Sequence, residues 1–276
     1  MADNFQLFSS LRHDPALTQV ASSGPDHAAW NRANASPLYM LDYHRDRMLR
    51  AATHWGWDAA VEVLRGDAGL KRLVAFIMSS IGHDQKAPLK VRISITKEGQ
   101  LGIDVGPVPE TPLANLFPDK LPSPKQTPSH EQTGTIPLKI PEYEVLVDGQ
   151  GTSRSEHTHF KTTRRAAYDA ARQRAQISLP DKKEVLLVNM ADGAVMEGSV
   201  TTVYLWRNGK WVTPAVSPQY SPGMGSGGQD GTTRRWALER GLAVEGTILA
   251  NSLADGEECW LSNGVRGFFF GRVKLS

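Results

Sequence analysis

Prolines are concentrated near the middle of the chain, above all in the run PVPETPLANLFPDKLPSPKQTP, which begins at Pro107. Each proline fixes φ and removes a backbone N–H group, so such a run can neither continue a helix nor lie inside a sheet. The chain has 276 residues, which is long enough for two modest domains, each with its own core. We therefore expect a small N-terminal α/β domain over residues 1–137, with this linker at its end, and a larger domain over residues 138–276.

Hydrophobic periodicity predicts helices and strands on both sides of the linker. Met48, Ala52 and Trp55 recur at helical spacing, whereas Val91–Thr96 alternates apolar and polar residues as a half-buried strand does. The expected helices are His44–Trp55, Ala59–Leu64, Leu70–Ile81, Thr162–Ile177 and Thr232–Gly241. The expected strands are Phe5–Leu11, Val91–Thr96, Leu101–Val105, Leu138–Val147, Val185–Met190, Val200–Trp206, Lys210–Thr213, Glu258–Ser262 and Gly267–Val273. This succession predicts an α/β (α+β) fold.

Composition and charge argue against several classes of protein. Lys+Arg 31 against Asp+Glu 29 gives a net charge of +2, a balance that does not suggest nucleic-acid or membrane binding. The single cysteine, Cys259, cannot form a disulfide within the chain, and its apolar neighbours predict a buried thiol. The N-terminal residues do not read as a signal peptide, and no apolar run approaches the ~20 residues that span a bilayer. We expect a cytoplasmic protein.

Four short motifs follow one another along the chain. The first is HRDR, which ends at Arg47, and the second is FKTTRR, which contains Lys161. The third, MEGSVTTVY, contains Glu197, and the fourth pairs GTTRR from Gly231 with SNGVRG from Ser262. Each motif alone occurs by chance in many proteins, whereas the ordered set is far more specific.

With these motifs in this order, the chain resembles the class IV, fold-type IV pyridoxal-phosphate enzymes from Phe5 to Val273. That family includes branched-chain aminotransferases, D-amino-acid aminotransferases, (R)-amine transaminases and 4-amino-4-deoxychorismate lyases. The resemblance implies a two-domain fold with a small N-terminal α/β domain and a pseudo-barrel sheet in the larger C-terminal domain. It also implies pyridoxal 5'-phosphate as the cofactor and a homodimer with the site near the subunit interface.

Lys161 is the residue to which the resemblance assigns the Schiff base with the cofactor. Pyridoxal phosphate stabilises the carbanion left when a bond to the amino-bearing carbon breaks. A lysine that reacts with it must be poorly protonated, which desolvation or nearby cations favour. Phe160 before Lys161, and Arg164 and Arg165 after it, suit both requirements. The alternative is a surface lysine at a helix start, where its charge would oppose the helix dipole.

Glu197 matches the family glutamate that keeps the pyridine nitrogen protonated; the alternative is a turn glutamate in solvent. For the phosphate, a helix N-terminus offers free N–H groups and a favourable dipole. The residues that the resemblance assigns to cofactor binding are Arg47, Glu197, Gly198, Ser199, Val200, Gly231, Thr232, Thr233, Ser262 and Asn263. An ordinary helix-surface charge is the alternative for the arginine in this set.

Two departures from the family pattern bear on which member this chain resembles. Gln229 occupies the position before the Thr-rich turn where many members have an apolar residue against the cofactor ring. Ala166 replaces the tyrosine that branched-chain aminotransferases typically carry five residues after the lysine. The pattern Lys-Thr-x-x-Arg from Lys161 instead resembles 4-amino-4-deoxychorismate lyases. Residues 7–12 and 262–267 resemble the fungal sequences usually described as such lyases. Residues 217–228, rich in Gly, Ser and Pro, form either an active-site lid or a simple loop.

The implied reaction splits 4-amino-4-deoxychorismate into 4-aminobenzoate and pyruvate, a step toward folate. Because the substrate carries two carboxylates, we expect arginines in the site, although each candidate could instead be a surface charge. The candidates are Arg12, Arg92, Arg165 and Arg266. One alternative is a transaminase acting on D-amino acids or (R)-amines through the same cofactor site. A second is an inactive relative that serves as a scaffold, against which the presence of both Lys161 and Glu197 speaks. We expect no metal site.

Overall fold

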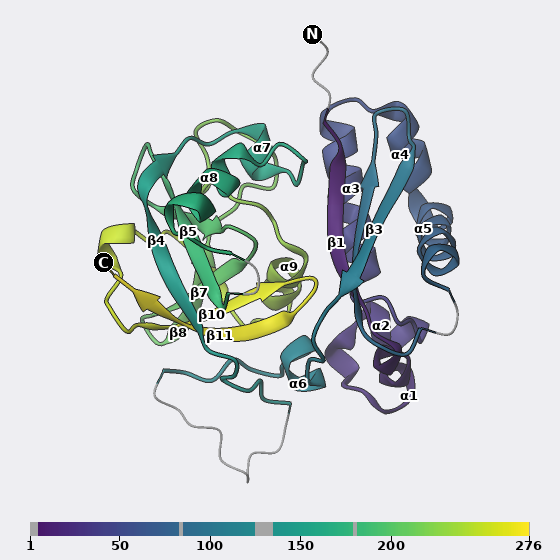
Figure 1. Cartoon of the computed structure of the whole chain (residues 1–276), viewed down its shortest axis with the longest axis horizontal. Helices are drawn as coiled ribbons and strands as arrows, with labels where there is room; N and C mark the ends of the chain where they lie inside the picture. The colour runs from purple at the N-terminus through teal and green to yellow at the C-terminus, as the bar shows by residue number, and fades with distance from the viewer. Residues whose placement is uncertain (1–4, 83–84, 125–134, 179–180, 276) are drawn as a thin grey trace. The chain divides into compact units, whose positions relative to one another are not determined.

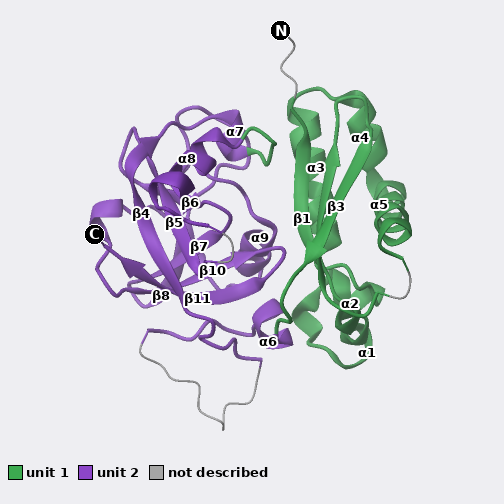
Figure 2. Cartoon of the chain, in the orientation of Figure 1, with its two compact units in different colours: residues 1–111, 160–164 green, residues 112–159, 165–276 purple. Residues whose placement is uncertain are grey.

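The computed structural model describes residues 5–82, 85–124, 135–178 and 181–275. The chain divides into two compact units, which Figure 2 colours separately. Unit 1 comprises residues 1–111 and 160–164, and unit 2 comprises residues 112–159 and 165–276. Figure 1 labels the helices and strands. The predicted mixture of helices and strands is confirmed. Among the described residues, every helix is too short or too polar to span a bilayer.

The described part of unit 1 contains a three-stranded antiparallel sheet in the order β1-β2-β3. Its strands are β1 (Leu7–His13), β2 (Leu89–Ile95) and β3 (Leu101–Pro107). Its helices are η1 (Pro15–Gln19), α1 (Val20–Ser23), η2 (Asp26–Ala28), α2 (Trp30–Asn34), α3 (Leu41–His54), α4 (Asp58–Leu64) and α5 (Gly66–Ile81). The three longest of these helices and all three strands fall close to the ranges that periodicity predicts.

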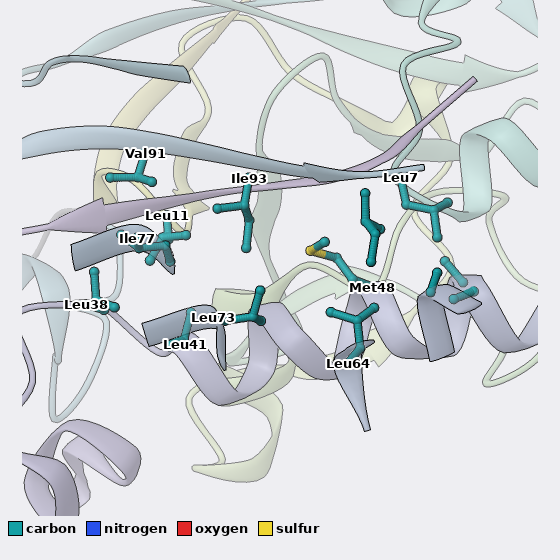
Figure 3. Close-up of a cluster of buried hydrophobic side chains, with 14 of the residues drawn as sticks. Leu7, Leu11, Leu38, Leu41, Met48, Leu64, Leu73, Ile77, Val91 and Ile93 are labelled. Carbon is teal, nitrogen blue, oxygen red and sulfur yellow. The ribbon is translucent and has the colours of Figure 1, made fainter. Parts of the chain in front are cut away.

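The core of unit 1 forms where apolar faces of α3, α4 and α5 meet the sheet. Val91 and Ile93 of β2 are fully buried, as alternation along a strand predicts. Both belong to one core cluster, in which Figure 3 shows Ile93 on the side that faces Leu73 of α5 and Met48 of α3. Gly69 allows α5 to lie close to the end of α4, because a Cβ atom there would lie 2.3 Å from the Leu64 carbonyl. These contacts fix β1 and α3 in unit 1.

The described part of unit 2 contains a curled eight-stranded sheet in the order β6-β5-β4-β11-β10-β7-β8-β9 (Figure 1). Its strands are β4 (Tyr143–Thr152), β5 (Lys183–Asn189), β6 (Val195–Gly198), β7 (Thr202–Arg207), β8 (Lys210–Pro214), β9 (Val244–Gly246), β10 (Glu258–Asn263) and β11 (Gly267–Lys274). Its helices are α6 (Leu113–Leu116), α7 (Glu156–His159), α8 (Ala166–Arg174), α9 (Thr232–Glu239) and η3 (Ala250–Ser252). Cys259 is fully buried, as predicted, and burial raises the pKa of its thiol.

Two expected elements begin at the wrong residue. The strand expected at Leu138–Val147 is β4, which begins at Tyr143, because Pro141 has no N–H group to donate to a neighbouring strand. The helix expected at Thr162–Ile177 is α8, which begins only at Ala166. The residues before α8 instead make backbone hydrogen bonds with the start of unit 1.

The boundary between the compact units also differs from the expected one. It falls at residue 111, whereas the proline-rich run predicts a domain boundary at residue 137. The reason lies in two buried indoles of unit 2. Trp211 Nε1 donates to the Leu121 carbonyl at 3.0 Å, and Trp260 Nε1 donates to the Pro122 carbonyl at 3.3 Å. Part of the proline-rich segment therefore packs with unit 2.

Candidate active site

Lys161 lies in an extended segment beside β1, not at a helix start. The Phe8 N–H group donates to the Lys161 carbonyl at 3.1 Å, and the Thr163 N–H group donates to the Gln6 carbonyl at 3.0 Å. The chain leaves unit 2 after residue 159, pairs with β1 of unit 1, and returns to unit 2 at residue 165. The expected conflict between Lys161 and a helix dipole therefore does not arise.

The aromatic ring of Phe8 contacts two predicted site residues, Lys161 and Arg92. The Lys161 Nζ atom lies 5.0 Å from the centroid of the Phe8 ring, and the Arg92 guanidinium lies 4.3 Å from the same centroid. Cations are attracted to the face of an aromatic ring at such distances. Phe8 is itself almost fully buried, so it is a fixed platform for both side chains.

Arg47 contacts Ser9, the residue that follows Phe8 in β1. Its Nη2 atom donates to Ser9 Oγ, and Ser9 Oγ lies 2.6 Å from His44 Nδ1. Burial, and then the charges of Arg47 and Lys161, hold the pKa of His44 well below its usual range. His44 is therefore neutral near pH 7. His44 lies one turn before Arg47 on α3, and it contacts the Ser9 hydroxyl group that accepts a hydrogen bond from Arg47.

Arg12 has a different environment from the other predicted substrate arginines. Its side chain is fully buried, its Nη2 atom lies 2.7 Å from Asp14 Oδ2, and its Nη1 atom donates to the Pro109 carbonyl at 2.9 Å. These bonds tie β1 to the segment after β3. These contacts give Arg12 a structural role, and its contact with substrate stays a prediction.

Glu197 lies in β6 and is 8% exposed, so it is not a turn glutamate in solvent. Its Oε1 atom accepts hydrogen bonds from the Tyr168 hydroxyl at 2.5 Å and from the Gln229 N–H group at 3.2 Å. The close approach of the Gln229 segment requires Gly228, because a Cβ there would lie 2.6 Å from the Met196 carbonyl oxygen. The result is a buried carboxylate held from two sides.

Neither Tyr168 nor Glu184 is among the residues that the sequence analysis selects. Glu184 lies beneath the turn formed by Gly198, Ser199 and Val200, where its carboxylate accepts from the N–H groups of Ser199 at 3.0 Å and Val200 at 3.2 Å. Both side chains are buried, and their partners come from separate elements, so no local sequence pattern indicates them.

Arg165, at the residue before α8, contacts the same turn. Its Nη2 atom donates to the Ser199 carbonyl at 2.7 Å, while Arg172 Nη1 donates to Ser199 Oγ at 3.0 Å. The guanidinium of Arg165 also lies 4.6 Å from the centroid of the Tyr168 ring. Arg165 is thus the substrate candidate that the structure brings to Glu197 and its turn.

Three buried hydroxyl groups meet at the N-terminus of α9, which begins at Thr232 after Gly231. Thr233 Oγ1 lies 2.8 Å from Ser262 Oγ, and the Tyr204 hydroxyl lies 2.9 Å from the same atom. Because Gln229 holds Glu197 and Gly231 precedes α9, one short segment positions both the carboxylate and the helix start. A helix N-terminus with hydroxyl groups is suited to bind an anion.

The remaining candidates lie around the turn between β10 and β11. Asn263 Nδ2 donates to the Val200 carbonyl at 3.3 Å, while Asn263 Oδ1 accepts from the N–H group of Arg266 at 2.9 Å. The Arg266 guanidinium lies 5.9 Å from the centroid of the Tyr143 ring on β4. Asn263 therefore contacts the turn that follows Glu197, whereas the Arg266 side chain contacts Tyr143 of β4.

Residues 217–228, the candidate lid, are irregular in structure. The Ser226 N–H group donates to the Ala215 carbonyl at 2.7 Å, and Asn189 Nδ2 donates to the Ser226 carbonyl at 3.2 Å. The second half of the segment is thus anchored to unit 2. That the segment acts as a lid stays a prediction.

Comparison with known proteins identifies the same family that the four sequence motifs indicate. Residues 29–272 match the family model described as amino-transferase class IV. The chain is 31% identical to the aminodeoxychorismate lyase of Saccharomyces cerevisiae over 197 residues, which are 67% of this chain and 51% of that protein. A relative from Schizosaccharomyces pombe is 31% identical over 129 residues, 45% of this chain and 52% of that protein. The chain thus spans about half the length of these curated relatives.

Solved structures share the fold. The 4-amino-4-deoxychorismate lyase from Pseudomonas aeruginosa has a TM-score of 0.58 and 16% identity, covering 98% of this chain and 83% of that chain. The fold IV-transaminase from Curtobacterium pusillum has a TM-score of 0.57 and 18% identity, covering 98% of this chain and 76% of that chain. The predicted fold-type IV architecture is confirmed.

Proposed function

Because the chain belongs to the aminotransferase class IV family, we propose that it is a pyridoxal-phosphate-dependent 4-amino-4-deoxychorismate lyase that forms 4-aminobenzoate and pyruvate. The observation that carries the choice of reaction is the 31% identity, over 197 residues, to a protein named as such a lyase. The main alternative is a transaminase for D-amino acids or (R)-amines, which would use the same cofactor residues.

The residues present fit the cofactor that the family implies. Glu197 offers a buried carboxylate, which is suited to pair with a pyridine nitrogen, and the hydroxyl-lined N-terminus of α9 is suited to a phosphate. Lys161 would hold the cofactor through a Schiff base, and Arg47 would add a phosphate contact. When bound, pyridoxal phosphate supplies an electron sink for the bond-breaking step.

Lys161 performs the proton transfers in this proposal. Its amine takes the proton from the amino-bearing ring carbon of the substrate and returns a proton to the departing pyruvate. The Nζ atom lies 5.0 Å from the centroid of the buried Phe8 ring of β1, an apolar neighbour that favours the neutral amine. Glu197 would pair with the pyridine nitrogen of the bound cofactor, and the two hydrogen bonds that its Oε1 atom accepts favour the ionised carboxylate.

Arginine side chains bind the two carboxylates of the substrate in the proposal. Arg165 and Arg92 are the preferred candidates, since Arg165 contacts the turn after Glu197 and Arg92 shares the Phe8 ring with Lys161. Arg266 stays a third candidate. Guanidinium groups suit this task because they bind carboxylates through paired N–H groups.

The test is to incubate the purified, cofactor-loaded chain with 4-amino-4-deoxychorismate and no keto acid. We expect equal amounts of 4-aminobenzoate and pyruvate, and neither product from the Lys161→Ala variant. If instead neither product forms, but an (R)-amine or a D-amino acid converts the cofactor to its amine form, the transaminase is the correct function. A chain that binds no cofactor would favour the inactive scaffold. The homodimer, the cytoplasmic location and the role in folate synthesis stay predictions.

A further inference from the structure

Three elements of unit 2 contribute to one buried hydrogen-bond chain. Tyr168 of α8 donates to Glu197 of β6 at 2.5 Å, and Gln229 Nε2, from the segment before α9, donates to the Tyr168 hydroxyl oxygen at 3.1 Å. Tyr168 is 2% exposed and Gln229 is 6% exposed. The Gln229 backbone N–H group completes a ring of contacts by donating to the same Glu197 oxygen.

The hydroxyl proton of Tyr168 lies toward Glu197. A tyrosine has one hydroxyl proton, and the Thr158 carbonyl, the other acceptor, lies farther away at 3.2 Å. Burial, and then the charge of Glu197, raise the pKa of Tyr168 well above its usual value, so the proton stays on the tyrosine. The Arg165 guanidinium on the ring face strengthens the hydroxyl group as a donor.

We propose that Tyr168 and Gln229 are positioning residues that hold the Glu197 carboxylate ionised and in one orientation. The inference rests on the proposed function, in which Glu197 pairs with the cofactor nitrogen. Two donors meet at Oε1, so the two carboxylate oxygens differ and the group cannot rotate without losing both bonds. Donation to a carboxylate stabilises its charged form relative to the acid.

Gln229 contributes two separable groups. Any residue other than proline would supply the backbone N–H group that Glu197 accepts, whereas the Nε2 group that binds Tyr168 is specific to the glutamine. This accounts for a polar residue at a position where relatives with an apolar one would face the cofactor ring. Gln229→Leu therefore removes only the support of Tyr168, and Tyr168→Phe removes the hydroxyl group itself.

The experiment compares Tyr168→Phe, Gln229→Leu and the wild type, all loaded with pyridoxal phosphate. Tyr143→Phe is the matched control, because Tyr143 is a buried tyrosine of unit 2 that packs against Phe269. Visible absorbance of the cofactor is titrated against pH, kcat and KM are measured, and thermal unfolding checks that each variant is folded.

Loss of the Tyr168 hydroxyl raises the pKa of Glu197 in this account, so the acid limb of both pH profiles moves upward by about one pH unit. We expect kcat to fall about tenfold while KM changes less than about twofold. Gln229→Leu should move the acid limb in the same direction by a smaller amount, and Tyr143→Phe should leave it in place.

Two results would overturn the inference. If the wild type binds the cofactor but Tyr168→Phe and Gln229→Leu both keep its pH profiles, Tyr168 and Gln229 do not position Glu197 and the proposed function stands. If the wild type binds no pyridoxal phosphate, the proposed function fails and the inference fails with it. In a Glu197→Gln background, adding Tyr168→Phe should have no further effect on the absorbance profile.

Discussion

Glu184 is buried beneath the turn that follows Glu197, and a change of one atom there should destabilise the protein. Its carboxylate accepts from the N–H groups of Ser199 and Val200 and from the Thr201 hydroxyl at 2.9 Å. Glu184→Gln would turn an N–H group toward these donors. We expect the free energy of unfolding in urea to fall by about 3 kcal/mol.

The matched control for this prediction is Glu144→Gln on the neighbouring strand β4. Glu144 is exposed and lies 3.6 Å from Lys183, so its loss should cost less than about 0.5 kcal/mol. Equal losses for the two variants would show that the carboxylate of Glu184 does not support the turn.

The lowered pKa of His44 should reduce the free energy of unfolding as the pH falls. Its folded pKa is held well below the unfolded value of about 6.5 by burial and by the charges of Arg47 and Lys161. Between those two pKa values the unfolded chain binds the extra proton, so stability falls as pH falls, by up to about 1.4 kcal/mol per pH unit. His44→Asn should show a shallower decline in urea unfolding between pH 7.5 and 5. Parallel curves for variant and wild type would contradict this.

The extended segment around Lys161 predicts how proline is tolerated there. Thr163→Pro removes the N–H group that bonds the Gln6 carbonyl, whereas Thr163→Ala keeps it and is the matched control. We expect the proline variant to unfold about 1 kcal/mol more easily than the alanine variant, and to bind the cofactor more weakly. In a helix beginning at Thr162, proline in the first turn would be harmless. Equal stability of the two variants would therefore favour the helix.

The elements that could be predicted from the sequence are those whose pattern is local. The buried positions of β2 and α5 repeat at strand and helix spacing, so periodicity alone finds them. The start of α8 could not be found in this way, because the partners of Thr163 and Lys161 are Gln6 and Phe8, more than 150 residues earlier in the chain.

The residues of the candidate site also fall into those that a local sequence motif indicates and those that it does not. Lys161, Glu197 and the start of α9 belong to motifs that are continuous in sequence. Tyr168 and Glu184 act through contacts between separate elements, and no local pattern marks them. The contacts of Arg12 with Asp14 and the Pro109 carbonyl could not be predicted from the sequence either, because Pro109 lies almost 100 residues further along the chain.

The whole molecule combines a shared fold with an activity that has to be measured on this chain. Class IV aminotransferase relatives establish its family, but the chain spans about half the length of the curated relatives it matches. The predicted site residues are distributed over both compact units. Lys161 belongs to unit 1, whereas Glu197 and α9 belong to unit 2. The proposed function depends above all on Lys161 as the residue that carries the cofactor.

Borohydride reduction of the protein loaded with pyridoxal phosphate, followed by peptide mapping, identifies the lysine that carries the cofactor. Reduction makes the Schiff base permanent, so the modified lysine can be identified by mass. We predict a pyridoxyl group on the peptide that contains Lys161, with loss of both the adduct and the visible absorbance in Lys161→Ala. Lys97→Ala, an exposed lysine in the turn of unit 1, should keep both. An adduct on another lysine, or absorbance that persists without Lys161, would contradict the account.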